Sequence, residues 1–119
     1  MSRVLVVDDE PDLRFMLRRT FERSGHEVAE ASDGAAALMS VAQVRPDLVV
    51  TDMTMPVMGG VELIRRLRAE PATAAIPILA VSGDSHLAVG ADAVLAKPYA
   101  WKELIVVAEG LLKEGRGHK

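Results

Sequence analysis

The sequence contains no cysteine, which excludes disulfides, thiolate nucleophiles and cysteine-based zinc or iron–sulfur sites. This absence fits a reducing compartment, and we expect the cytoplasm. Aromatic residues make up only 3% of the chain and the net charge is −3, so we expect no direct binding to nucleic acid. No apolar run approaches the roughly 18 residues that a membrane-spanning helix needs, so we expect no membrane contact.

The chain is long enough for one domain and too short for two independent cores. It has 119 residues, of which 50% are hydrophobic and 26% charged, a mixture typical of globular proteins. We expect one folded domain over residues 1–114, followed by a polar tail over 115–119. Two interpretations of this ending stay open, a stand-alone protein or a piece of a longer chain.

Short aliphatic runs alternate along the chain with segments of helical period. The expected strands cover residues 4–7, 27–30, 47–52, 77–81 and 93–96, and the expected helices cover 12–24, 35–44, 61–69 and 101–112. Such an alternation predicts an α/β fold, a doubly wound five-stranded parallel sheet with helices on both faces. In such sheets, ligands bind at the carboxyl ends of the strands.

The first expected helix has two kinds of apolar residue. Four share one helical face, which we expect to pack on the sheet: Leu13, Met16, Leu17 and Phe21. Phe15 lies off this face, and we expect it to be exposed.

Polar residues stand where four of the strands end. Asp8 and Asp9 follow the first strand, Asp52 ends the third, and the fourth and fifth are followed by Ser82 and Lys97. Because carboxylates a few ångströms apart repel one another, a convergence of these three acids requires a cation. Oxygen ligands without cysteine favour a hard ion, Mg²⁺ or alternatively Mn²⁺.

Such a metal centre is suited to phosphate chemistry. Mg²⁺ held by few carboxylates keeps coordination positions for phosphate oxygens. An aspartate can then act as the nucleophile and form an acyl phosphate, while a lysine offsets the charge of the transferred group. Asp52 is the best candidate for the nucleophile, with Lys97 and Ser82 beside it.

The fragments at the strand ends resemble those of a known family. They are Val7-Asp8-Asp9, Asp52-Met53-Thr54-Met55-Pro56 with Gly60, Ser82, and Lys97-Pro98-Tyr99. In this order they are similar to the receiver domain of two-component response regulators, the CheY-like signalling proteins. The resemblance implies the flavodoxin-like strand order 2-1-3-4-5, a receiver domain over residues 1–114 and a cis Lys97–Pro98 peptide bond.

The resemblance also implies roles for individual residues. Asp52 would be the phosphoacceptor, with Lys97 pairing with the phosphoryl group and Ser82 turning toward it. Asp9, Asp52 and the backbone carbonyl of Met53 would bind Mg²⁺ directly, and Asp8 would bind it through a water.

Function and partners follow from the same resemblance. The chain would be a phosphorylation-controlled signalling switch that takes its phosphoryl group from a histidine kinase, a phosphotransfer protein or acetyl phosphate. It would catalyse only its own phosphorylation and dephosphorylation, and its downstream protein target is not indicated. The family docks its kinase on the first helix, which makes Phe15 a candidate contact.

Two departures from the family bear on the switch. Only 14 residues separate Ser82 from Lys97, about two helical turns fewer than usual, so we expect a short or absent fourth helix. Val94 stands where the family usually has a switch aromatic, so we expect an altered readout of phosphorylation. Tyr99 is either a docking residue or packs the last helix onto the sheet.

Three other functions are alternatives to this hypothesis. A flavodoxin-like FMN carrier needs a phosphate-binding loop after the first strand, where this chain has the acidic loop Asp8-Asp9-Glu10-Pro11-Asp12. An aspartate-nucleophile phosphatase needs an Asp two residues after the nucleophile, where Thr54 stands. The remaining alternative is a receiver-like interaction module whose phosphorylation site is not used.

Overall fold

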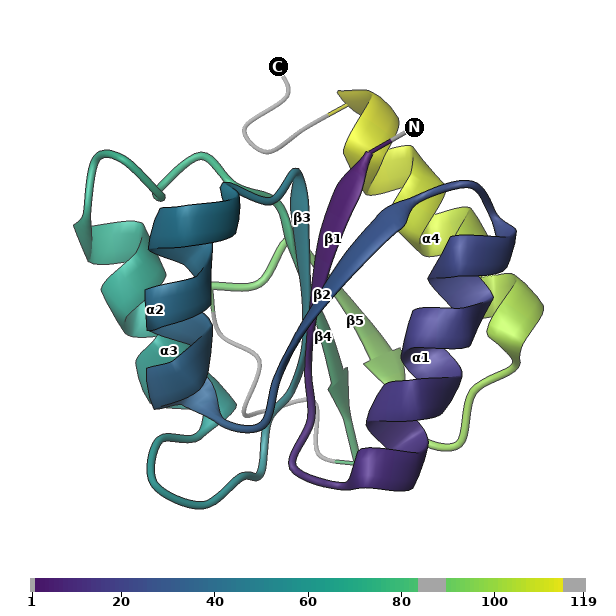
Figure 1. The fold of residues 1–119 in the computed structure, drawn as a ribbon, viewed down its shortest axis with the longest axis horizontal. Helices are drawn as coiled ribbons and strands as arrows, with labels where there is room; N and C mark the ends of the chain where they lie inside the picture. Colours follow the sequence, from purple (N-terminus) through teal and green to yellow (C-terminus); the bar gives the residue numbers. More distant parts are fainter. Residues whose placement is uncertain (1, 84–89, 115–119) are drawn as a thin grey trace.

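A five-stranded parallel sheet forms the centre of the protein in the computed structural model, which describes residues 2–83 and 90–114 (Figure 1). The strands are β1 (Arg3–Val7), β2 (Glu27–Ala31), β3 (Leu48–Asp52), β4 (Ile78–Ser82) and β5 (Ala93–Ala96). The described helices are α1 (Pro11–Arg23), α2 (Gly34–Val44), α3 (Gly60–Ala69) and α4 (Trp101–Glu114). The sheet order is β2-β1-β3-β4-β5, which confirms the predicted fold class.

The helices cover both faces of the sheet. Figure 1 shows α2 and α3 on one side, and α1 and α4 on the other. The core is accordingly split into two clusters, in which alternate residues of each strand point to opposite faces, as with Leu5 and Val6 of β1. Every residue of β3 and β4 is buried, because these strands lie inside the sheet and are covered twice. Burial on both faces explains why the sequences of these two strands are mostly apolar.

The apolar face of α1 is only half buried, which corrects the prediction for this helix. Leu17 and Phe21 are buried, but Leu13 is exposed and Met16 has 62% of its surface exposed. The exposed pair lies in the first half of α1, where it lines a groove of about 520 Å³ shared with the start of α4. The helix therefore seals the core only along its second half.

The segment between β4 and β5 carried the prediction of a short or absent fourth helix. Residues 84–89, on which that prediction falls, lie outside the described residues. None of the described helices combines the length and the apolar character that a membrane span requires.

Candidate functional site

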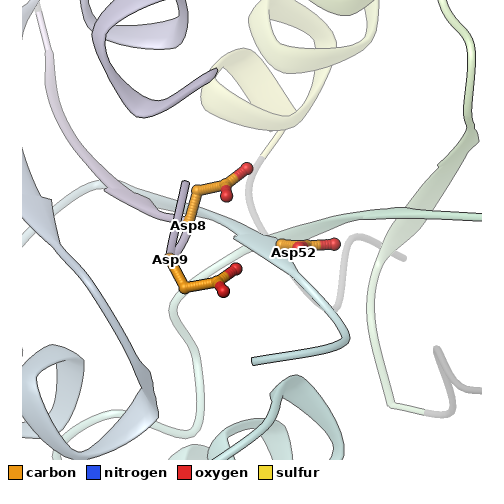
Figure 2. Close-up of side chains that lie close together, drawn as sticks. All are labelled: Asp8, Asp9 and Asp52. Carbon is orange, nitrogen blue, oxygen red and sulfur yellow. The ribbon is translucent and has the colours of Figure 1, made fainter. Parts of the chain in front are cut away.

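Three carboxylates meet at the carboxyl edge of the sheet. Asp8 and Asp9 directly follow β1, Asp52 is the last residue of β3, and these two strands are neighbours. One oxygen from each of the three lies within 4.8 Å of the others, and Figure 2 shows the side chains grouped at the strand ends. The predicted convergence of these acids is therefore observed.

The electrostatics of the cluster favour a bound cation. Only 3% of Asp8 is exposed. Burial raises the pKa of Asp8, and the negative charges of Asp52 and Asp9 raise it further, against the opposing effects of the Glu10 backbone N–H and of Lys97. A divalent ion among these oxygens would offset that repulsion, and an all-oxygen ligand set suits Mg²⁺. The residues present thus fit the metal that the sequence predicted.

Lys97 lies against the central carboxylate. Its Nζ is 3.1 Å from Oδ1 of Asp52, and the same oxygen accepts a hydrogen bond of 2.9 Å from the backbone N–H of Met53. Partial burial works against the lysine charge, but the hydrogen bond to Asp52 and the nearby carboxylates outweigh it and raise the pKa of Lys97. Lys97 is therefore positively charged where a phosphoryl group on Asp52 would bring further negative charge.

The backbone carbonyl of Met53 has a partner of its own. It accepts a hydrogen bond of 3.0 Å from the N–H of Gly60, at the start of α3. A Cβ atom on Gly60 would lie 2.6 to 2.8 Å from Met53 and Asp52, so glycine allows this close approach. Because a carbonyl oxygen has two lone pairs, a metal-binding role for Met53 stays a prediction.

Ser82 and Lys97 lie beside each other at the same edge. Ser82 is buried at the end of β4, and its backbone oxygen accepts a hydrogen bond of 3.0 Å from the N–H of Lys97. The Lys97–Pro98 peptide bond is cis, as the resemblance implied. The rotation of the Ser82 side chain toward a phosphoryl group stays a prediction.

The candidate switch and docking residues lie in three different settings. Phe15 is 56% exposed, as predicted, with the guanidinium of Arg19 at 5.8 Å from its ring centroid. Val94 is partly exposed on β5, the last strand of the sheet. Tyr99 is half-buried and packs against the core under α1 and α4, as the packing interpretation expects.

The groove between α1 and α4 was missed by the sequence analysis. It begins at Asp8 and Lys97 and continues over apolar side chains that include Met16, Trp101 and Leu104. The spacing of Leu13 and Met16 gave no signal for it, since the same pattern is typical of a core-facing helix. The groove connects the carboxylate cluster to an apolar surface.

Comparison with known proteins identifies close relatives. The sequence pattern described as the response regulator receiver domain matches residues 4–109. The transcriptional regulatory protein PrrA of Mycobacterium tuberculosis is 42% identical over 116 residues, which cover 93% of this chain and 50% of that protein. The DNA-binding response regulator MtrA of Mycolicibacterium smegmatis is 36% identical over 119 residues, covering 94% of this chain and 51% of MtrA. The chain thus spans about half the length of these relatives.

Solved structures show the same fold. The chemotaxis response regulator CheY4 of Vibrio cholerae superimposes with a TM-score of 0.87 at 31% identity, covering 93% of this chain and 98% of CheY4. The response regulator protein TrrA of Thermotoga maritima, solved in complex with Mg²⁺ and BeF, gives a TM-score of 0.85 at 30% identity, covering 93% of this chain and 99% of TrrA.

Proposed function

Because this chain belongs to the response regulator receiver domain family, we propose that it is a phosphorylation-controlled switch in which Asp52 accepts a phosphoryl group with the help of Mg²⁺. The observation that carries the proposal is the grouping of Asp8, Asp9 and Asp52 within 4.8 Å, with Lys97 at 3.1 Å from Asp52. A set of strand-end caps and surface ion pairs would not require three like charges to converge.

The residues of the site divide the chemistry among them. An oxygen of Asp52 attacks the phosphorus and forms an acyl phosphate, while the bond from phosphorus to the donor atom breaks and the donor keeps the electron pair. The ammonium of Lys97, already held at Asp52, pairs with the phosphoryl oxygens. Mg²⁺, when bound by Asp9 and Asp52 and through a water by Asp8, supplies further positive charge beside those oxygens.

The phosphoryl donor is proposed to be a histidine kinase or a phosphotransfer protein, with acetyl phosphate as a small-molecule donor. Phe15 is the proposed kinase contact, because it is a large apolar side chain exposed on α1, the helix that follows the acidic pair Asp8 and Asp9. Phe15→Ala is expected to slow transfer from a kinase and to leave transfer from acetyl phosphate unchanged. An equal loss with both donors would contradict the docking role.

Phosphorylation is proposed to change which proteins this domain binds. The conformational change that links the two is proposed to differ from the family's usual one. Ser82 lies at the site, but Val94 on the adjacent strand offers no ring that could change position on phosphorylation. Amide chemical shifts with and without beryllofluoride test this. A wide response along β5, as in a receiver domain with an aromatic switch, would contradict it.

The predicted absence of direct binding to nucleic acid stays a prediction. MtrA is described as a DNA-binding response regulator, and this chain spans about half of it. The cytoplasmic location and the restriction of catalysis to the domain's own phosphorylation are likewise proposed from the family.

Mass spectrometry tests the proposal. Incubation with acetyl phosphate and Mg²⁺ should add about 80 Da to the intact chain, the mass of one phosphoryl group. The adduct should be absent in Asp52→Asn and in samples treated with EDTA. An unmodified wild-type chain would favour the alternative, an interaction module whose acidic site is not used.

A further inference from the structure

Arg14, which lies outside the carboxylate cluster, is hydrogen-bonded to the loop that contains Asp8 and Asp9. Nη1 of Arg14, on α1, donates a hydrogen bond of 2.7 Å to the backbone carbonyl of Asp8. Its Nε donates a second, of 3.0 Å, to Oε1 of Glu30 on β2. The side chains of Arg14 and Glu30 are 20% and 28% exposed, so this pair is better shielded from water than an ordinary surface ion pair.

Two further polar groups of Asp8 are also hydrogen-bonded. Its backbone N–H donates to the carbonyl of Ala31 at 3.1 Å, and its Oδ1 accepts from the N–H of Glu10 at 2.9 Å. Arg14 supplies the bond to the carbonyl, which belongs to the peptide unit between Asp8 and Asp9. Because a peptide unit is planar, fixing that carbonyl also fixes the direction in which the chain enters Asp9.

We propose that Arg14 is a positioning residue of the metal site, acting through the Asp8–Asp9 peptide unit. The inference rests on the proposed function, since it assigns Arg14 to the Mg²⁺ site of that function. Its guanidinium is paired with Glu30 and donates to a carbonyl, so it orients the acidic loop without occupying a carboxylate oxygen of the cluster. The planar fork of arginine suits this double contact, which a single ammonium group cannot reproduce.

Arg18 provides a matched control within the same network. Its Nη1 donates to Oε2 of Glu30 at 2.7 Å, and its Nε donates to Glu22 at 2.9 Å. Arg14 and Arg18 thus share the partner Glu30, but the bond to Asp8 comes from Arg14. A comparison of the two separates the contact with the acidic loop from the general effect of losing a charge near β2.

The test is the dissociation constant for Mg²⁺ alone, measured by isothermal titration calorimetry on the wild type and on Arg14→Ala, Arg14→Lys and Arg18→Ala. Unfolding in urea without metal measures stability separately. Loss of an outer contact to a metal site typically weakens affinity 10- to 100-fold, so we expect about 10-fold for Arg14→Ala and several-fold for Arg14→Lys. Arg18→Ala should stay within about 2-fold, whatever its effect on stability.

Two results would overturn the inference while leaving the proposed function intact. One is wild-type Mg²⁺ affinity in both Arg14 variants, and the other is an equal loss in Arg18→Ala. A wild-type chain that binds no Mg²⁺ at millimolar concentration would overturn the proposed function together with this inference.

Discussion

Replacing Asp8 by Asn should stabilise the metal-free protein. Asp8 is buried beside two other carboxylates, with ligand oxygens within 4.8 Å. Two unit charges at that distance repel by about 3.5 kcal/mol at an effective dielectric constant of about 20. The attraction of Lys97 to Asp8 is lost at the same time, so the net gain should be about 1 to 2 kcal/mol, or roughly 4 to 8 °C in Tm. Asn keeps an oxygen that can accept the Glu10 N–H, which Ala would lose.

The pH dependence of this gain has a defined sign. Burial and the neighbouring carboxylates raise the pKa of Asp8 above its ordinary 3.8, so below the raised pKa the native state binds more protons than the unfolded state. Wild-type stability therefore improves relative to the variant as the pH falls through the raised pKa. The stability gained by Asp8→Asn should be greatest above that raised pKa, and it should fall toward zero as the pH approaches 3.8.

The assay is urea unfolding with and without Mg²⁺, with Asp33→Asn as the control. The Asp33 carboxylate caps α2 by accepting a hydrogen bond of 2.8 Å from the Ala36 N–H, and it lies outside the cluster, so its replacement should change stability by only a few tenths of a kcal/mol. Mg²⁺ at ten times its Kd should add about 1.4 kcal/mol to the wild type and clearly less to Asp8→Asn. A metal-free Asp8→Asn less stable than wild type would refute the reasoning.

Three further predictions concern stability, each measured by urea unfolding. Val57 has a φ of 67°, a strained backbone conformation for valine, and is 85% exposed, so Val57→Gly should stabilise the protein by about 1 kcal/mol. A loss of stability would contradict this strain. Gly60→Ala places its Cβ under 3.0 Å from backbone atoms and should lower stability by about 2 kcal/mol. Gly83→Ala is the control, since its Cβ would have no atom within 4 Å and stability should change little. Equal losses in the two variants would refute the packing argument. Arg68 pairs with Asp92 at 2.6 Å, both side chains being 15% exposed, so Arg68→Ala should cost about 2 to 4 kcal/mol, and a change below about 0.5 kcal/mol would show that the pair contributes little.

The sheet and the carboxylate cluster could be predicted because their signals are local. Each buried strand is a short aliphatic run, and the residue that ends it reaches the same edge of a parallel sheet by geometry alone. Asp8 and Asp52 therefore follow from the sequence once strand order is known, and the order came with the resemblance.

Features that depend on how helices meet could not be predicted in this way. The apolar pattern of Met16 is the same whether α4 covers it or leaves a groove, so its exposure needed the packing of α1 against α4. The contact between Arg14 and the Asp8 carbonyl is another case, because an arginine on a helix is most often a solvated surface residue. Val57 was missed for a different reason, since β-branched residues rarely adopt positive φ and nothing in the sequence marks one that does.

A crystal structure of the protein with bound Mg²⁺ and beryllofluoride, which stands in for a phosphoryl group, would show directly whether Asp52 is the phosphoacceptor. We expect the beryllium on an oxygen of Asp52, with the nitrogen of Lys97 beside its fluorides. One metal ion should be held by Asp9 and Asp52, and Asp8 should contact it through a water. Beryllofluoride on another residue, or a metal ion bound away from these three carboxylates, would contradict it.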